Sequence, residues 1–284
     1  MHNGRFRGRT ISVVTDLSLD EQIYLYDKTR ELKRLRSAGE SLERFRIADN
    51  DVGIYLIFLE PSTRTKESFR NAAEFHTVRV NNFEGQFSSF NKKESYADTF
   101  KMLTGYSEYS IFVVRTKLEG VCRWLEDAIG AFADRHGRLR PSFINGGDGK
   151  HEHPTQEFLD EFSFYEHKGW NRDHIRIALI GDLYHGRTTH SKVDGLRVFR
   201  EVEVDLIAPE ELAMPEYYVR KMRENGFSVR AFGSLEEYLG QKHVADIWYF
   251  TRLQLERMGE DVLEKADQLR EAVKIGRASC RERV

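Results

Sequence analysis

The chain has 284 residues, of which 44 are lysine or arginine and 46 are aspartate or glutamate, so its formal net charge is −2. Hydrophobic residues make up 40% and charged residues 32%, a balance that excludes an intrinsically disordered protein. Nucleic-acid binders concentrate basic charge, so a nearly neutral chain argues against a nucleic-acid partner. The length predicts one large or two medium domains.

Two cysteines, Cys122 and Cys280, are too few for a disulfide scaffold or a cysteine-rich zinc site. No apolar run reaches the ~18 residues of a membrane span, and residues 1–16 lack the apolar stretch of a signal peptide. These features predict a cytoplasmic protein that has no membrane partner.

Short apolar runs alternate with amphipathic segments along most of the chain. The predicted strands are 51–59, 111–114, 142–145, 175–180, 204–208, 229–232 and 246–250. The predicted helices are 19–36, 65–76, 120–136, 155–167, 188–200, 216–225 and 235–241. Ser18 with Glu21, and Ser234 with Glu237, have the spacing of a capping box at a helix start. The alternation predicts an α/β fold with two domains, each a parallel sheet flanked by helices.

The predicted domain boundary follows the glycine-rich segment 146–149, at the start of the 155–167 helix. Residues 1–154 form the first expected domain and residues 155–274 the second. Residues 275–284 break the preceding pattern and resemble the in-frame translation of a sequencing adapter, so we expect a non-native tail there.

A run of hydroxyl side chains and one arginine follows the strand at 51–59. Ser62, Thr63, Arg64 and Thr65 stand where a helix is expected to begin. Helix N-termini present free N–H donors and the positive end of the helix dipole, so they bind anions. An ordinary Ser/Thr cap would explain one such residue, but the whole run favours a phosphate site.

Two histidines, His151 and His153, are spaced i and i+2, which suggests a metal site only weakly. Metal sites on helices favour i, i+4 spacing, and no third ligand is evident. His153 and Gln156 are one helical turn apart and could both reach one small polar substrate. A single histidine of this kind is more often a surface residue or a satisfied structural residue.

Four arginines fall at or just beyond predicted strand ends: Arg64, Arg115, Arg187 and Arg252. Ligands of open α/β sheets bind at the carboxyl ends of strands, so this placement predicts a small substrate with several negative charges. The turn before Arg187 lacks the G-x-G-x-x-G spacing of dinucleotide-binding proteins. For the segment that contains Ser88 and Lys92, the hydrophobic periodicity taken alone predicts a solvated loop that precedes a helix.

Taken together and in this order, Ser-Thr-Arg-Thr, His-Pro-Thr-Gln, Gly-Arg-Thr and Thr-Arg-Leu-Gln resemble the catalytic chains of the aspartate carbamoyltransferase family, over about residues 10–274. The resemblance implies the carbamoyltransferase fold, with carbamoyl phosphate bound by residues 1–154 and L-aspartate by residues 155–274. It implies transfer of a carbamoyl group to aspartate, an early step of pyrimidine biosynthesis, without a metal or an organic cofactor.

The resemblance also assigns residue roles. It places carbamoyl phosphate on Ser62, Thr63, Arg64, Thr65, Arg115, His153 and Gln156, with Arg64, Thr65, Arg115 and His153 as the catalytic residues. It places aspartate on Lys92, Arg187, Arg252 and Gln254. Ser88 and Lys92 would come from a neighbouring subunit, which implies a homotrimer. The sequence does not decide whether regulatory chains bind that trimer.

Two alternatives stay open, together with one departure from the family. Ornithine carbamoyltransferases usually carry a Ser-Met-Gly loop where this chain has residues 251–254, and Arg252 there would repel a cationic substrate. A carbamoyltransferase-like subunit without turnover is the other alternative.

The family's His-Pro-Leu-Pro-Arg segment and C-terminal helix do not occur before residue 274, so we expect a C-terminal truncation, which leaves the activity of this polypeptide open.

Overall fold

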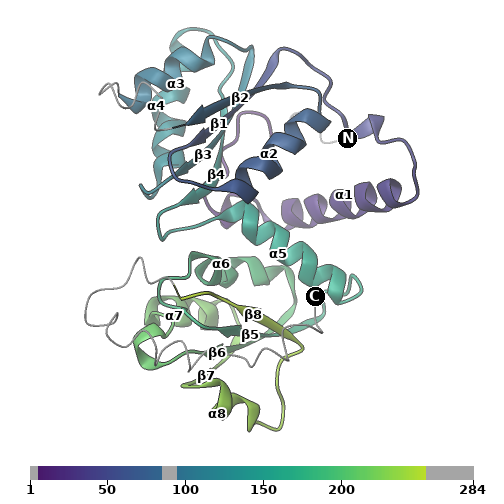
Figure 1. The fold of residues 1–284 in the computed structure, drawn as a ribbon, viewed down its shortest axis with the longest axis vertical. Coiled ribbons are helices and arrows are strands. Elements are labelled where there is room, and N and C mark those ends of the chain that lie inside the picture. Colours follow the sequence, from purple (N-terminus) through teal and green to yellow (C-terminus); the bar gives the residue numbers. More distant parts are fainter. Residues whose placement is uncertain (1–5, 85–94, 254–284) are drawn as a thin grey trace. The chain divides into compact units, whose positions relative to one another are not determined.

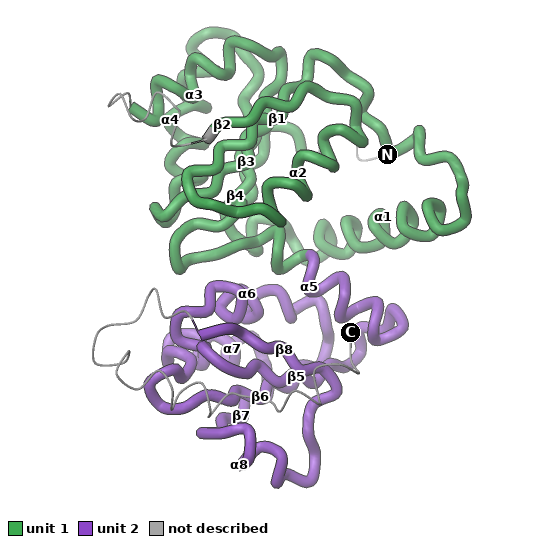
Figure 2. Tube along the Cα trace, in the orientation of Figure 1, with its two compact units in different colours: residues 1–158 green, residues 159–284 purple. Residues whose placement is uncertain are grey.

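The computed structural model describes residues 6–84 and 95–253. The chain divides into two compact units, residues 1–158 and residues 159–284 (Figure 2). The division falls inside helix α5 (Pro154–His167), which therefore contributes its first turn to unit 1 and its remaining turns to unit 2. No helix within the described ranges is long and apolar enough to cross a membrane.

Unit 1 is built on one parallel sheet (Figure 1). Its strands are β1 (Val52–Phe58), β2 (Arg79–Glu84), β3 (Tyr109–Thr116) and β4 (Ser142–Asp148), in the order β2-β1-β3-β4. Its helices are α1 (Leu19–Ser37), α2 (Thr63–Phe75), α3 (Tyr96–Thr104) and α4 (Val121–Arg135), with short 3-10 turns at Val14–Asp16 and Glu43–Phe45. Every described strand pair in this sheet is parallel, which confirms the predicted α/β class.

Helix α1 begins where the sequence predicts. The Ser18 N–H donates to Glu21 Oε2 at 2.8 Å, and the Glu21 N–H donates to Ser18 Oγ at 3.4 Å. This reciprocal capping box satisfies two N–H groups that the first turn of a helix otherwise leaves without partners.

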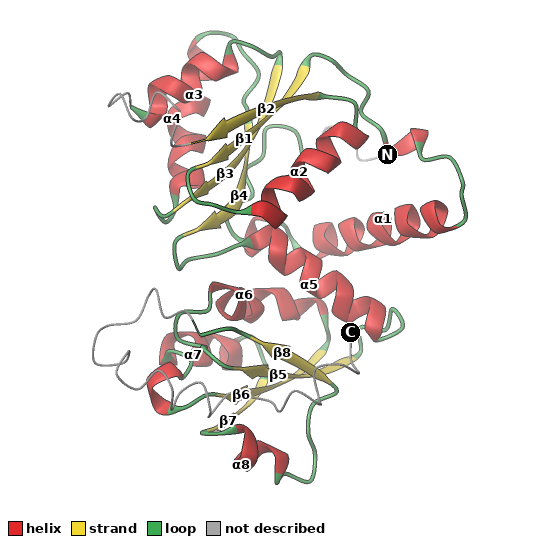
Figure 3. Cartoon of the chain, viewed as in Figure 1, coloured by secondary structure: helices red, strands yellow, loops and turns green. Residues whose placement is uncertain are grey.

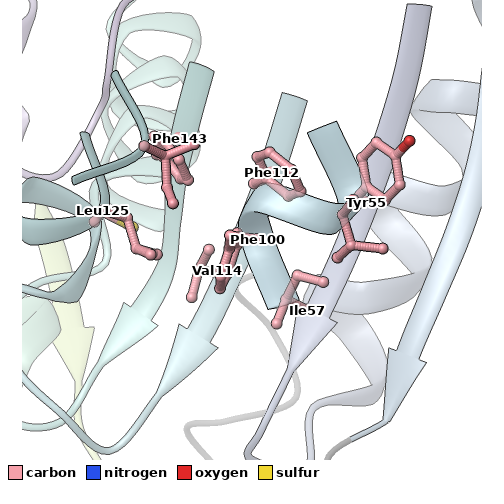
Figure 4. Close-up of a cluster of buried hydrophobic side chains, with 10 residues drawn as sticks. Tyr55, Ile57, Phe100, Phe112, Val114, Leu125 and Phe143 are labelled. Carbon is pink, nitrogen blue, oxygen red and sulfur yellow. The ribbon is translucent and has the colours of Figure 1, made fainter. Parts of the chain in front are cut away.

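The core of unit 1 lies on both faces of the sheet, because successive side chains of a strand point to opposite faces. On one face, Phe112 of β3 packs between Tyr55, Phe100 and Phe143, with ring centroids 4.9, 4.9 and 5.3 Å away (Figure 4). Helices α3 and α4 cover this face. On the other face, Leu56, Phe58 and Val113 pack against Phe69 of α2. The buried alternation of β1 and β3 therefore places α2 and α4 on opposite sides.

Unit 2 repeats the same plan (Figure 3). Its parallel sheet has the order β7-β6-β5-β8, formed by β5 (His174–Ile180), β6 (Glu201–Ile207), β7 (Ser228–Phe232) and β8 (Ile247–Phe250). The helices after α5 are α6 (Arg187–Gly195), α7 (Glu216–Glu224) and α8 (Leu235–Leu239), with 3-10 turns at Leu196–Val198 and Glu210–Leu212. The predicted 188–200 helix is thus shorter and ends in a 3-10 turn.

A close backbone approach joins the ends of β5 and β8. The Thr251 N–H donates to the Ile180 carbonyl at 2.8 Å. Gly181 has φ +115°, and a Cβ at this position would lie 2.4 Å from the Thr251 carbonyl oxygen. A side chain at residue 181 would therefore push apart the two loops that leave these strands.

We predict that Gly181→Ala destabilises unit 2 more than Gly226→Ala does. Gly226 also has a positive φ, +84°, but a Cβ added there would have no atom within 4 Å. Gly226→Ala should lower the free energy of unfolding by about 1 kcal/mol, the cost of a left-handed backbone at alanine. Gly181→Ala should lower it by about 1–3 kcal/mol more, because the collision forces the backbone to shift. Urea denaturation followed by tryptophan fluorescence measures both, and equal losses would contradict the steric argument.

Candidate active site

The ends of β1 and β3 form a topological switch point in unit 1. The chain leaves β1 towards α2 on one face of the sheet and leaves β3 towards α4 on the other face. The two strand ends are neighbours, since Phe58 pairs with Arg115 and the Leu59 N–H donates to the Arg115 carbonyl at 2.9 Å. Such points are where open α/β sheets bind their ligands.

The start of α2 is open to an anion. Ser62 occupies the N-cap position, yet its side chain makes no capping hydrogen bond, and the first turn contains no acidic residue. By contrast, the N-cap serines of α1, α3 and α8 accept hydrogen bonds from the first turn, and each of those turns contains an acidic residue. The first turn of α2 therefore keeps both its N–H donors and its uncompensated dipole.

Hydroxyl and guanidinium groups surround this helix start. Thr63 and Arg64 are exposed, and Ser62 and Thr65 are partly exposed. Arg64 makes no ion pair with any residue inside the described ranges. Three hydroxyls, a guanidinium and free backbone N–H groups at one helix N-terminus are the groups that hold a phosphate.

Arg115 lies at an irregularity of the sheet. The register between β3 and β4 shifts between Val114 and Thr116, and bulges of this kind re-aim side chains near active sites. Arg115 Nη1 donates to the Gly146 carbonyl of β4 at 2.9 Å. This hydrogen bond holds the Arg115 guanidinium near the carboxyl edge of the sheet.

His153 joins the same edge from a distant part of the sequence. Its Nε2 lies 3.4 Å from Thr65 Oγ1, and its Nδ1 lies 3.3 Å from Thr155 Oγ1. His153 is only 6% exposed. Helix α5 begins at Pro154, so His153 stands just before the helix and not on it, while Gln156 lies in the first turn and donates its N–H to the His153 carbonyl at 3.0 Å.

The turn that leads to His153 depends on Asp148, a residue that the sequence analysis did not single out. Its carboxylate accepts hydrogen bonds from Asn145 Nδ2, the Glu152 N–H, the Gly120 N–H and His151 Nδ1, at 2.8–3.0 Å. Burial opposes ionisation of Asp148, but these hydrogen bonds outweigh it and hold the pKa of the carboxyl below its usual range. The only local signal was the glycine-rich run 146–149.

In unit 2 the ends of the parallel neighbours β5 and β8 lie side by side at one edge of the sheet. Arg187 is the first residue of α6, whose N-cap, Gly186, provides no side-chain hydrogen bond and whose first turn contains no acidic residue. Buried Asp182 fixes the preceding turn by accepting hydrogen bonds from the N–H of His185 at 3.0 Å and from its Nδ1 at 3.1 Å. Arg252 follows β8 by two residues and is exposed. Both arginines thus follow adjacent parallel strands.

Three of the predicted site residues, Ser88, Lys92 and Gln254, lie outside the described residues, as does the segment 275–284. No group of three or more His, Cys, Asp or Glu side chains suited to a metal ion occurs in the described part of the chain.

Comparison with known proteins agrees with this geometry. Residues 9–166 match the family described as aspartate/ornithine carbamoyltransferase, carbamoyl-P binding domain. The protein PyrBI of Thermotoga maritima is 65% identical over 271 residues, which cover 94% of this chain and 51% of that protein. The aspartate carbamoyltransferase catalytic subunit of Saccharophagus degradans is 37% identical over 258 residues, covering 87% of this chain and 72% of that subunit.

A solved structure shows the same fold. The aspartate transcarbamoylase of Trypanosoma cruzi, in complex with carbamoyl phosphate and aspartate, superposes with a TM-score of 0.76 at 29% identity, covering 97% of this chain and 82% of that one. The chain spans about half the length of the Thermotoga maritima relative. From the family match and these similarities, the chain belongs to the aspartate/ornithine carbamoyltransferase family and, within it, to the aspartate carbamoyltransferase catalytic chains.

Proposed function

We propose that this chain transfers the carbamoyl group of carbamoyl phosphate to the amine of L-aspartate, giving N-carbamoyl-L-aspartate and phosphate. The observation that carries the proposal is the convergence of the open α2 start, Arg115 and His153 at one switch point. We place the reaction in the cytoplasm, as an early step of pyrimidine biosynthesis.

Residues 1–154 bind carbamoyl phosphate in this proposal. Ser62, Thr63, Arg64 and Thr65 hold the phosphate at the start of α2, where N–H groups and hydroxyls are available. Arg115, His153 and Thr65 donate to the carbamoyl oxygen, and Gln156 holds the carbamoyl amide. The 3.4 Å separation of Thr65 Oγ1 and His153 Nε2 supports two donors that reach one oxygen.

Residues 155–274 bind aspartate. Arg187 holds the α-carboxylate at the start of α6, and Arg252 with Gln254 holds the side-chain carboxylate. Two arginines that follow adjacent parallel strands suit a dicarboxylate, since each guanidinium can bind one carboxylate through two hydrogen bonds. The same charges disfavour ornithine, whose side chain is cationic.

The chemistry needs no metal and no cofactor. The aspartate amine attacks the carbonyl carbon of carbamoyl phosphate, and the C=O electron pair moves onto oxygen. Donors from Thr65, Arg115 and His153 stabilise this oxyanion, and a donor of this type typically lowers the barrier by about 3–4 kcal/mol. The oxyanion then collapses, the bond from carbon to the bridging oxygen breaks, and the departing phosphate accepts the amine proton.

We also propose a homotrimer in which Ser88 and Lys92 of one subunit complete the site of its neighbour. The support is the membership in the aspartate carbamoyltransferase catalytic chains. Sedimentation equilibrium tests this proposal, since the chain mass of 33.2 kDa predicts an assembly three times as heavy. If regulatory chains bind the trimer, a mixture of the two should give a larger mass in the same measurement.

Product formation with L-aspartate and with L-ornithine, measured side by side, tests the reaction. We expect carbamoyl-aspartate and no citrulline. Turnover of ornithine alone would overturn the role given to Arg252. If a folded protein forms no product with either substrate, the result would favour a subunit that binds carbamoyl phosphate without turning it over.

We predict that Arg252→Ala raises the KM for aspartate by about 100-fold, because the variant leaves a carboxylate without its charged partner. The affinity for carbamoyl phosphate should stay unchanged. Arg220→Ala is the matched control, since Arg220 is an exposed arginine of unit 2 on α7. Steady-state kinetics with each substrate varied in turn measure both variants, and unaltered aspartate kinetics in Arg252→Ala would refute the assignment.

We predict that His153→Asn lowers kcat by about 10²–10³-fold, the usual loss for one oxyanion donor. The KM for aspartate should change little, because His153 acts on the carbamoyl oxygen. His136→Asn, at the end of α4, provides a control in the same unit. A His153→Asn variant that lost only substrate affinity would contradict a role in the transition state.

A further inference from the structure

The turn from Asp148 to His153 carries a second histidine that the proposed reaction does not use. The turn closes on itself, because the Asp148 N–H donates to the Glu152 carbonyl at 3.2 Å and the His151 N–H donates to the Asp148 carbonyl at 3.0 Å. His153 follows directly. The conformation of this turn therefore determines where the His153 imidazole lies relative to Thr65.

The Asp148 side chain joins the turn to two other parts of unit 1. It is 2% exposed. Its Oδ1 accepts from Asn145 Nδ2 at 2.9 Å and from the Glu152 N–H at 3.0 Å, and its Oδ2 accepts from the Gly120 N–H at 2.8 Å. Donors from the strand, from the turn and from the start of α4 thus meet on one carboxylate, so a shift of any one segment strains the others.

His151 completes this set of donors. Its Nδ1 lies 3.0 Å from Asp148 Oδ2, and its side chain is 37% exposed, so solvent protons reach the ring. The hydrogen bond to Asp148 raises the pKa of His151 above its usual value, although burial partly opposes this. A protonated imidazole donates a charge-assisted hydrogen bond, which is stronger than that of the neutral ring.

The carboxylates around His151 act in the same direction. Besides Asp148, the carboxylates that act on it are Glu152, on its own turn, and Glu119, in the loop before α4. Glu119 also accepts the Lys150 N–H at 3.0 Å. Arg123 of α4 is occupied by Asp16 and Glu126. The three carboxylates Asp148, Glu152 and Glu119 all favour the imidazolium form of His151, while Lys150 is the adjacent cation in the sequence.

We propose that Asp148 is a positioning residue for His153 and that the hydrogen bond from protonated His151 to Asp148 strengthens this positioning. The kcat/KM for carbamoyl phosphate should therefore fall as His151 loses its proton. The inference rests on the proposed function, because it assigns the turn to the carbamoyl phosphate site of that reaction. Neither Asp148 nor His151 contacts the substrate in this account.

The first test compares kcat/KM for carbamoyl phosphate in the unchanged chain and in His151→Asn across pH. Asparagine keeps a neutral donor near the position of Nδ1 but does not titrate. The ratio of the two values cancels every titration that both proteins share. It should be about fivefold near pH 6, the advantage of a charge-assisted over a neutral hydrogen bond, and about one near pH 8.5.

His136→Asn is the matched control. His136 also forms a hydrogen bond through Nδ1, which donates to the Phe132 carbonyl at 2.8 Å, but it lies at the far end of α4 from the turn. The ratio of kcat/KM for carbamoyl phosphate between the unchanged chain and His136→Asn should stay near one at every pH. A flat ratio for His151→Asn as well would overturn the inference and leave the proposed reaction standing.

Thermal unfolding separates positioning from mere stabilisation. A raised pKa in the folded state means that His151 stabilises the protein at low pH and that this contribution is lost as the pH rises through the folded pKa. The difference in Tm between the unchanged chain and His151→Asn should therefore shrink from pH 6 to pH 8.5. A difference in Tm that shrinks while the kinetic ratio stays flat would assign His151 a structural role only.

Asp148→Asn tests the centre of the network. An amide would turn an NH₂ group towards donors, so kcat/KM for carbamoyl phosphate should fall about 100-fold, as expected when a buried charged acceptor is removed. Adding His151→Asn to this variant should change nothing further. If Asp148→Asn does not fold, His151→Asn alone decides.

A ligand that cannot react keeps this test apart from the proposed reaction. Phosphonoacetamide replaces the bridging oxygen of carbamoyl phosphate by a methylene group, so its affinity reports the site without turnover. If the chain turns over neither aspartate nor ornithine, the same pH-dependent ratio in phosphonoacetamide affinity would support the positioning role while the reaction fails. In a chain without turnover, an unchanged ratio would overturn the positioning role in addition to the failed reaction, whereas in an active chain it would overturn the positioning role alone.

Discussion

Parallel pairing of strands whose connections leave in opposite directions is the constraint on which the rest of this structure depends. In unit 1 these neighbours are β1 and β3, and in unit 2 the parallel neighbours β5 and β8 likewise end at one edge of their sheet. Because both strands of a parallel pair end at the same edge, loops distant in sequence must meet there. The apolar alternation of the strands sets the pairing, and the pairing places every described arginine of the proposed site.

The starts of the helices that follow β1 and β5 differ from those of α1, α3 and α8. Helices α1, α3 and α8 neutralise their N-termini with serine caps and acidic first turns. Helices α2 and α6 have neither. The chain has a slight excess of acidic residues, with a net charge of −2, yet none of them lies in the first turn of the two helices where negative substrates are proposed to bind. The distribution of charge, and not its total, carries the functional information.

Sequence reasoning succeeded where the cause of a structure is local. The capping box of α1 and the strand and helix alternation depend on neighbours within one turn or one strand, and the structure confirms them. Strand β2 was missed because its sequence, Arg-Val-Asn-Asn-Phe-Glu, is mostly polar, and β2 lies at a sheet edge, where a continuous apolar run is not required. Helix α6 was predicted five residues too long, because the continuation into a 3-10 turn has no distinct pattern.

The site needed contacts that no local pattern encodes. Thr65 and His153 are 88 residues apart, and only the folded sheet brings their side chains to 3.4 Å. Asp148 escaped notice for the same reason, because one of its partners, Gly120, is 28 residues away and belongs to the start of another helix. What the sequence did reveal, arginines after strands, follows from a rule about all parallel sheets and needed no knowledge of these contacts.

Unit 2 contains a buried ion pair in which one carboxylate joins several segments of the chain, as Asp148 does in unit 1. Lys192 of α6 has a fully buried side chain, and its Nζ donates to Asp160 Oδ2 of α5 at 2.9 Å, the oxygen that also accepts from the Tyr249 hydroxyl of β8 at 2.9 Å. The rings of Phe164 and Tyr249 lie 5.3 and 4.8 Å from the ammonium. Buried ion pairs seldom add net stability, because desolvation offsets the attraction, but losing one partner leaves a costly charge. Such a pair therefore tolerates only one arrangement of α5, α6 and β8, and α6 begins with Arg187 while β8 leads to Arg252.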